Sequence, residues 1–492
     1  MDLAAAVDGG EHRQHYGVTL AVLAVAALAY AFMQTMVAPA LTDIQRSLGV
    51  STTSVTWVLT AYLLTASVAT PVFGRFGDMF GKERTLLAVL VVFALGSLVC
   101  ALSHSLAVLI LGRAIQGVGG AVFPLAFGII RDEFPRDRVP AGIGLISATF
   151  GIGGGAGLIL GGVIVDHLDY EWIFWFGLMM TVVAIVTTRL FVPESPVRSP
   201  GQIDWGGAAL LAAGLVCLLL PVSEGNTWGW GSARILGLFA TALGLLAIWA
   251  WYELRAAEPL VDIRLLRQRP VWTTNLVGLL VGFGMFGSFL LIPQFVQAPP
   301  QAGYGFAATV TQAGVFLMPS AVVMLLAGPI AGALGTRVGS RLPLQIGTLV
   351  TASSFGFLAV AHSERWQIYV GSALLGIGIG FAFASMANLI VDAVPQERTG
   401  EATGMNTIMR TIGGAFGAQI TASIVAAHLI SGSPLPAEQG YTDAFIMSCV
   451  ALLIAFAACL AIPRPRSPAG VEPLVEPAAP SANPRDRELT QR

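Results

Sequence analysis

The sequence predicts an all-α integral membrane protein with fourteen spanning helices, and three observations support this prediction. Of the 492 residues, 55% are hydrophobic and only 11% are charged, whereas about a quarter of the residues in soluble domains carry a charge. Fourteen apolar segments approach the roughly 20 residues that cross a bilayer. The basic residues gather in alternate loops, as the positive-inside rule describes for short loops.

The spans follow one another along the whole chain with short connections. Their expected ranges are 17–40, 52–73, 85–103, 106–130, 139–165, 172–192, 204–222, 234–253, 271–297, 308–334, 342–361, 366–391, 401–427 and 443–462. An even number of spans places both termini on one side of the membrane. The loops on the other side hold only Arg46, Arg234 and Arg365, so both termini are expected in the cytoplasm.

An internal repeat divides the chain. Asp132 corresponds to Asp392 at an offset of about 260, and the segment 135–138 corresponds to 395–398. Parallel repeats of this kind occur in transporters whose binding site lies between the two halves. The expected domains are a cytoplasmic tail (1–16), a six-helix bundle (17–192), an inserted helix pair with cytoplasmic linkers (193–270), a second six-helix bundle (271–462) and a disordered cytoplasmic tail (463–492).

Several classes of function find no support in the sequence. It contains no G-x-x-x-x-G-K-[ST] loop, no cluster with metal-ligand spacing and no nucleophile–base pair, so we expect neither an enzyme nor a cofactor, a metal or ATP-driven transport. The net charge of −2 gives no indication of a nucleic-acid partner. Four cysteines lie in apolar segments and are interpreted as small core residues.

The stretch Gly74–Arg84, G-R-F-G-D-M-F-G-K-E-R, is predicted to be a charged turn between the second and third spans. Its glycines permit tight turns and close approach of the backbone, and its basic residues place it on the cytoplasmic side. It is either a hairpin that only anchors topology or part of a gate. The candidate gate residues are Gly74, Arg75, Asp78, Gly81 and Arg84.

Two arginines lie within spans, where a charge is costly by roughly 2.5–3.5 kcal/mol. Arg113 faces either a central cavity or, by snorkelling, the outer surface, and Gln116 shares its helix face. Arg410 lines the inner half of the cavity or snorkels inward. Gln34 of the first span completes this set of candidate cavity residues. No carboxylate stands at the centre of a span.

The fifth span contains G-I-G-G-G-A-G-L-I-L-G-G at residues 151–162. Glycines let a neighbouring backbone approach closely, so packing is one interpretation. A hinge for conformational exchange is the other. The candidate hinge and interface residues are Gly153, Gly157, Gly161 and Gly162.

Eight stretches, in this order, resemble the fourteen-helix drug:proton antiporter branch of the major facilitator superfamily over nearly the whole chain. They are Gly74–Arg84, Arg113–Gly117, Gly153–Gly162, Glu171–Phe174, Asp204–Gly207, Trp228–Trp230, Glu258–Leu260 and Asn406–Arg410. The resemblance implies a major facilitator fold of two six-helix bundles with two inserted helices. It also implies a cytoplasmic gate at Asp78, a proton-coupling site beside Arg113 and a flexible interface along the fifth span.

Two positions depart from the family pattern. The first helix of the family carries an Asp where this chain has Met33, which removes the expected proton carrier. The fifth-helix signature has Gly-Pro where this chain has Gly157-Leu158, which removes a helix kink. Asp43 and Asp166 are possible substitutes for the missing carboxylate, or ordinary solvated loop residues.

The leading hypothesis is a monomeric exporter of hydrophobic or amphipathic small molecules in the cell membrane, working by alternating access and coupled to proton influx. Its partners are the substrate, protons and the lipid bilayer. The alternatives are a carrier of a lipid or lipid-like metabolite without such coupling, and a membrane sensor that binds a ligand without moving it. Candidate lining residues are Met33, Gln34, Phe123, Phe150, Met285, Phe286, Phe289, Gln294 and Met318.

Overall fold

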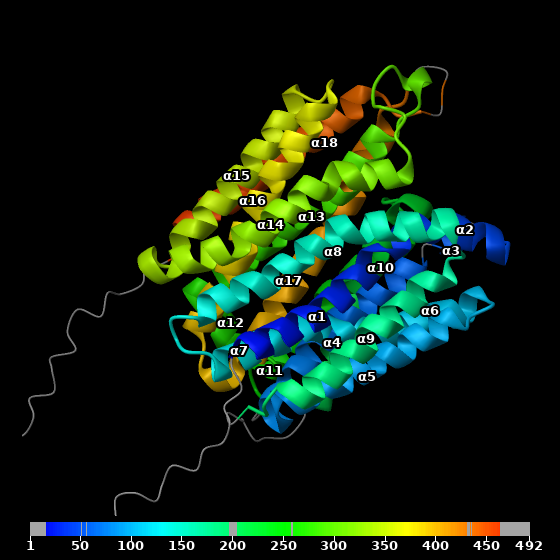
Figure 1. Ribbon diagram of the computed structural model, residues 1–492. Coiled ribbons are helices and arrows are strands. Elements are labelled where there is room, and N and C mark those ends of the chain that lie inside the picture. Colours follow the sequence, from blue (N-terminus) through cyan, green and yellow to red (C-terminus); the bar gives the residue numbers. More distant parts are fainter. Residues whose placement is uncertain are drawn as a thin grey trace, which may run out of the picture. The chain divides into compact units, whose positions relative to one another are not determined.

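Helices make up nearly all of the chain (Figure 1). The computed structural model describes residues 16–50, 52–55, 57–195, 204–256, 259–430, 433 and 435–462. The two expected tails lie outside these ranges, apart from Tyr16. Glu258, which begins one of the family-like stretches, also lies outside them. Apart from one isolated bridge between Leu429 and Pro436, the described residues form no strand.

The helices cover the chain from residue 16 to residue 460. In order they are α1 Tyr16–Thr35, α2 Val37–Leu48, α3 Thr52–Val55, α4 Trp57–Phe80, α5 Lys82–Ala101, α6 Leu106–Gln116, η1 Gly117–Ala121, α7 Val122–Glu133, α8 Val139–His167, α9 Glu171–Phe191, α10 Trp205–Trp228, α11 Ala233–Glu253, α12 Ile263–Leu266, α13 Arg269–Val296, η2 Pro300–Ala302, α14 Val310–Val338, α15 Arg341–Val360, α16 Arg365–Ala393, η3 Gln396–Arg398, α17 Thr399–Ala427 and α18 Glu438–Leu460.

Each expected span has a helix, which confirms the all-helical membrane fold. Thirteen helices within the described ranges are long and apolar enough to cross a bilayer. The helix that does not meet this criterion is α17, although it has 29 residues. Its sequence is rich in Gly and Thr and contains Glu401 and Arg410, and most of its residues up to Gly417 are buried among other helices. Helices shielded from lipid in this way tolerate polar side chains.

The prediction of a turn over Gly74–Arg84 is wrong. Helix α4 continues to Phe80 and α5 begins at Lys82, so Gly81 is the only non-helical residue between them. Gly81 has φ 111°, a conformation that glycine adopts without a steric penalty. The charged residues suggested a solvated loop, but Asp78 and Lys82 are buried in helices because they pair with each other and with other polar groups.

Two other spans are interrupted. The first ends α1 at Thr35 and continues as α2 up to Leu48, beyond the expected end at residue 40. The fourth changes from α6 to the 3₁₀ turn η1 and back to an α-helix at Val122. The glycines of η1 lie close to α4 and α5: a Cβ on Gly117 would stand 2.7 Å from the Tyr62 carbonyl oxygen. Close backbone packing therefore accompanies the change of helix type.

The N-terminal helices (α1–α9) and the C-terminal helices (α13–α18) meet along two long contacts, α8 with α14 and α4 with α17. Figure 1 shows α8 and α14 side by side. Helix α10 packs on α11, α4 and α17. Residues up to Ile462 form one compact unit, and the division into two bundles stays a prediction. We call the end of the molecule where α4 meets α5 the Gly81 end.

Candidate functional site

At the Gly81 end, Asp78 binds the first turn of α17. The Gly400 backbone N–H donates to Asp78 Oδ1 at 3.3 Å, and the Glu401 N–H donates to Oδ2 at 3.1 Å. These amides have no partner within their own helix, and a carboxylate there also interacts favourably with the helix dipole. Gly74 lies beside this contact, because a Cβ on it would stand 2.7 Å from the Gly400 carbonyl oxygen. Helices α4 and α17 thus touch backbone to backbone.

Lys82 joins Asp78 to α7. Its Nζ lies 2.6 Å from Asp132 Oδ2 and 3.6 Å from Asp78 Oδ1, and all three side chains are buried. Gln396 Nε2 donates to Asp132 Oδ1 at 3.0 Å, and the Ser195 hydroxyl donates to Oδ2. Asp132 therefore links the N-terminal helices to the turn between α16 and α17.

Arg131 makes a third link between the same helices. Its guanidinium donates to the Val394 and Pro395 carbonyls at 2.9 and 3.1 Å and to Thr399 Oγ1 at 2.5 Å. A cation at the carboxyl end of a helix, here α16, also interacts favourably with the helix dipole. We call Asp78, Lys82, Arg131 and Asp132 the latch residues.

The structure places the candidate gate residues in two groups. Gly74 and Asp78 contact α17, and Arg75 is buried in the same part of α4. Arg84, in contrast, is 69% exposed and pairs with Glu194 at 3.3 Å. Gly81 forms the turn, and a side chain there would also meet Glu194. Lys82 is a charged neighbour in ion-pair contact with Asp78, and it was not among the candidate gate residues predicted from the sequence.

The linker after α11 also reaches the first turn of α17. The Asp262 backbone N–H donates to Glu401 Oε1 at 2.5 Å, and Arg398 donates to Asp262 Oδ2 at 2.7 Å. Glu401 is 2% exposed, and its other oxygen, Oε2, has no hydrogen-bond partner among the described residues. The sequence analysis missed this buried carboxylate because Glu401 lies at the expected start of a span.

Five aromatic rings form a continuous row through the centre of the molecule. Their centroids are separated by 5.7 Å (Tyr62–Tyr30), 6.0 Å (Tyr30–Phe123), 5.1 Å (Phe123–Phe150) and 5.9 Å (Phe150–Phe383). These spacings are typical of favourable ring pairs. The first four rings belong to N-terminal helices and Phe383 belongs to α16, so the aromatic row crosses the contact between the two sets of helices. One arginine lies at each end of it.

Arg113 stands over Tyr62, with its guanidinium carbon 4.0 Å from the ring centroid. It donates to the Val58 carbonyl at 3.0 Å, to the Met33 carbonyl at 3.2 Å and to Gln116 Oε1 at 2.7 Å. Gln116 in turn donates to Ser97 Oγ at 2.7 Å. The side chain of Arg113 is fully buried and does not reach the surface. Its contacts tie together α1, α4, α5 and α6.

We expect Arg113→Lys to lower the stability of the protein by roughly 1–3 kcal/mol, because a point-like ammonium cannot replace a planar fork that reaches three acceptors. Thermal unfolding in detergent measures this change. Arg46→Lys is the control, since Arg46 is 77% exposed and pairs only with Asp43. If the variant is as stable as the wild type but no longer transports, Arg113 instead binds the transported species.

Arg410 occupies the other end of the aromatic row. Its guanidinium carbon lies 4.3 Å from the Phe383 centroid and 5.8 Å from that of Phe150. Within the described part of the chain it makes no hydrogen bond or ion pair, although it is 4% exposed. Gln34 is half-buried, and its Oε1 likewise has no partner among the residues described.

Met33, which replaces the acid of the family pattern, faces away from Arg410. Its side chain packs against Gly177 of α9, where a Cβ would collide with the Met33 sulfur. Its backbone carbonyl accepts from Arg113. Met318, a candidate lining residue, is 44% exposed and lies on the surface of α14. Neither side chain joins the aromatic row.

The four candidate hinge glycines lie on two faces of α8. Gly153 and Gly157 face α1, and Thr35 Oγ1 donates to the Gly153 carbonyl at 2.5 Å. Gly161 faces Met36 and Pro39, where α2 begins. Gly162 faces α14, where a Cβ would stand 3.1 Å from Thr311 Oγ1. Helix α8 runs without a break from Val139 to His167. The glycines therefore lie at close helix contacts, and their role as a hinge stays a prediction.

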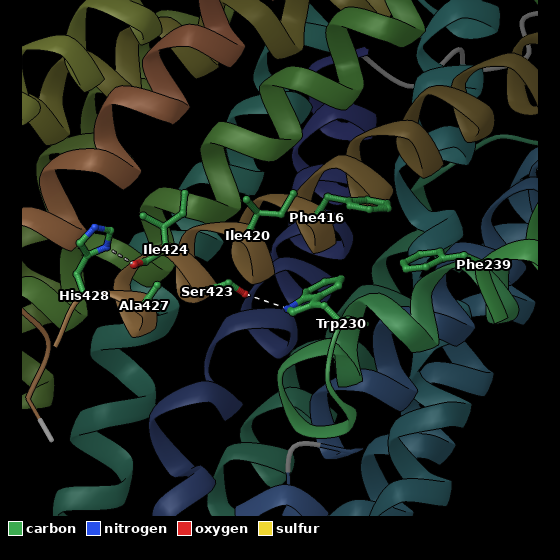
Figure 2. A pocket seen from close by; sticks show the side chains of 8 residues that line it. All are labelled: Trp230, Phe239, Phe416, Ile420, Ser423, Ile424, Ala427 and His428. Atoms are coloured by element: carbon green, nitrogen blue, oxygen red, sulfur yellow. Dashed lines mark hydrogen bonds between the residues drawn. The ribbon is translucent and has the colours of Figure 1, made fainter. Parts of the chain in front are cut away.

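A groove of about 520 Å³ lies beside the other half of α17 (Figure 2). Trp230 Nε1 donates to Ser423 Oγ at 3.2 Å across it, and the rings of Phe239 and Phe416 stack with centroids 6.5 Å apart. The residues that line it are mostly apolar: Trp230, Phe239, Phe416, Ile420, Ser423, Ile424, Ala427 and His428. None of the lining residues expected from the sequence is among them.

Two known resistance proteins resemble this chain in sequence. The tetracenomycin C resistance and export protein of Streptomyces glaucescens is 30% identical over 390 residues, which cover 78% of this chain and 71% of that protein. Multidrug resistance protein 3 of Bacillus subtilis is 31% identical over 356 residues, which cover 71% of this chain and 68% of that protein.

The fold and the family profile agree with these likenesses. The crystal structure of the human organic anion transporter MFSD10 (TETRAN) superimposes with a TM-score of 0.64 at 16% identity, over 90% of this chain and 99% of that one. The profile of the Major Facilitator Superfamily matches residues 23–418 and 300–487. Nearly the whole chain is thereby accounted for, and the protein belongs to the Major Facilitator Superfamily.

Proposed function

We propose that this chain is an exporter of the fourteen-helix drug:proton antiporter branch. It moves hydrophobic or amphipathic small molecules out of the cell as a monomer, by alternating access coupled to proton influx, with both termini in the cytoplasm. Family membership and two relatives, one named for tetracenomycin C export and one for multidrug resistance, support export. The Gly81 end is then the cytoplasmic end.

One observation carries the alternating-access part of the proposal. At the Gly81 end, hydrogen bonds of Asp78, Arg131 and Asp132 join the N-terminal helices to α17 and to the turn before it. Lys82 pairs with both aspartates on the N-terminal side of this contact. Polar pairs of this kind can be exchanged for bonds with water when the helices separate, so they suit a contact that forms and breaks in each cycle. A permanent contact would be expected to be mainly apolar.

Glu401 is the group that we propose carries the proton. It lies at the same contact, and Oε2 is free to accept a proton without loss of the bond between Oε1 and the Asp262 amide. Its backbone N–H also donates to Asp78, so protonation of Glu401 acts directly on one of the latch residues. This assignment supplies a carboxylate that the first helix lacks at Met33.

Efflux of two dyes, cationic rhodamine 6G and anionic carboxyfluorescein, from cells that express the protein tests the proposal, and efflux of either dye supports export. We expect expression-dependent efflux that a protonophore abolishes, and in Glu401→Gln we expect residual efflux that no longer responds to the protonophore. Glu438→Gln is the control, because Glu438 belongs to the opposite end of the molecule. Saturable binding of a dye without efflux of either one would contradict export and indicate a sensor.

Movement of a lipid or lipid-like metabolite is the second candidate. The apolar groove between Trp230 and α17 favours it, because its lining suits an acyl chain better than a polar solute (Figure 2). Met33 in place of the acid favours it too. Transport that persists in the presence of the protonophore would support this candidate over proton-coupled export.

A further inference from the structure

We infer that Arg410 binds an acidic group of the transported molecule, so that the preferred substrates are amphipathic organic anions. This inference rests on the proposed export function and specifies its substrate class. Arg410 is 4% exposed, and it makes no hydrogen bond or ion pair with any residue that the structure describes. A guanidinium has five N–H donors, and burying donors without acceptors is costly. The chain leaves the Arg410 nitrogens open to the space beside them, so their acceptors are water or a bound molecule.

Arg113 provides the contrast within the same molecule. It is equally deep, but its Nε and Nη1 donate to Val58, Met33 and Gln116, and its Nη2 is enclosed by protein without a partner among the described residues, so this guanidinium packs the N-terminal helices and is closed to a ligand. The guanidinium of Arg410, in contrast, stands over the faces of Phe383 and Phe150. Stacking on a ring holds a guanidinium in place and leaves the N–H groups at its edge available.

The surroundings of Arg410 favour an anion over a cation. Asn406, one turn before it, donates to Asn275 Oδ1 at 3.0 Å, and both side chains are neutral. None of the acids in the described ranges forms an ion pair with either arginine at the ends of the aromatic row. Two buried positive charges without a carboxylate repel a cationic ligand. A carboxylate, sulfonate or phenolate would receive paired N–H bonds from the guanidinium.

The aromatic row suits the apolar part of such a molecule. Phe150 belongs to α8 and Phe383 to α16, so a ligand held by Arg410 next to these rings would contact both the N-terminal and the C-terminal helices. Contact with both sets is what lets a bound molecule bias their relative movement. Aromatic or hydrophobic anions therefore fit this position better than small hydrophilic ones.

Binding of two dyes that share a xanthene frame tests the inference. Carboxyfluorescein is anionic and rhodamine 123 is cationic, and fluorescence anisotropy measures the binding of each to the purified full chain in nanodiscs. We expect the wild type to bind carboxyfluorescein more tightly than rhodamine 123. Arg410→Met should weaken carboxyfluorescein binding by roughly 10- to 100-fold, the value of a charge-assisted pair of hydrogen bonds. Arg410→Lys should restore part of the affinity.

Arg255→Met is the matched control. Arg255 also stands over an aromatic ring, 4.1 Å from the Trp251 centroid, but it is exposed, and its loss should leave dye binding unchanged. If Arg410→Met is not recovered as folded protein, Arg410→Gln and Arg410→Lys provide the comparison. Three results would overturn the inference. They are equal affinity of carboxyfluorescein for the wild type and the uncharged variant, tighter binding of rhodamine 123 than of carboxyfluorescein to the wild type, and no binding of carboxyfluorescein.

The inference and the export proposal fail in different ways. In one outcome, the purified protein binds carboxyfluorescein through Arg410 while cells show no efflux of carboxyfluorescein or rhodamine 6G. That result would contradict export and support the binding site. Efflux of a cationic dye that is unchanged in Arg410→Met would retain export and overturn the anion site. Loss of carboxyfluorescein efflux in Arg410→Met, with normal efflux in Arg255→Met, supports both.

Discussion

Asp78→Asn is expected to reduce export at least about tenfold while the protein remains folded in the membrane. Asp78 is fully buried, accepts two N–H groups from α17 and pairs with Lys82. The amide keeps only one acceptor oxygen and leaves Lys82 with less countercharge. Lys82 keeps Asp132 as a partner, so the main loss is a hydrogen bond to a charged group, roughly 1.5–3 kcal/mol, which changes a population by about 10- to 100-fold. The state with a closed Gly81 end should therefore become rare.

Two measurements on the same variant check this expectation. The initial rate of dye efflux reports the transport cycle. Hydrogen–deuterium exchange of residues 399–404 reports the contact, since one of the Gly400 and Glu401 amides loses its acceptor. Asp43→Asn is the control because Asp43 pairs only with the exposed Arg46. Wild-type efflux, or slow exchange at residues 399–404 in Asp78→Asn, would show that Asp78 is not part of a moving contact.

The membrane-spanning helices could be predicted because each is indicated by the residues of its own segment. Length and apolar composition locate each helix, although α2, α4 and α10 end at Leu48, Phe80 and Trp228, beyond the expected residues 40, 73 and 222. Even α17 was found, although it is too polar for a hydropathy criterion. The end of α4 could not be predicted in the same way. Its charges resemble those of a loop, and only contacts with α7 and α17 make a helical, buried Asp78 stable.

In the candidate site, too, contacts within one helix could be predicted and contacts between distant helices could not. Arg113 and Gln116 are one turn apart, so their contact followed from helical spacing. Arg131 contacts Val394, Pro395 and Thr399, more than 260 residues away, and no local pattern indicates such a pairing. The repeat that relates Asp132 to Asp392 marked this region, but not the bond from Gln396 to Asp132. Partners of this kind depend on the packing of whole helices.

Helices α8 and α14 approach each other backbone to backbone near the Gly81 end, where Gly144 faces Gly328. A Cβ on Gly144 would overlap with the Gly328 carbonyl oxygen and stand 2.8 Å from the carbonyl carbon. A Cβ on Gly328 would likewise overlap with the Gly144 carbonyl oxygen. A backbone cannot move aside as a flexible side chain can. One added methyl group therefore forces the N-terminal and C-terminal helices apart at this point.

Gly144→Ala is accordingly expected to reduce export roughly tenfold or more, because overpacking costs about 1–3 kcal/mol and this cost falls on the closed Gly81 end alone. The efflux rate and the hydrogen–deuterium exchange of residues 139–146, which should become faster, measure the effect. Gly244→Ala is the matched control: Gly244 lies in helix α11 with nothing within 4 Å of an added Cβ, so alanine there should leave export unchanged and slightly favour the helix. If Gly144→Ala exports at the rate of Gly244→Ala, then α8 and α14 do not need their close contact for transport, and the alternating movement must use a different interface.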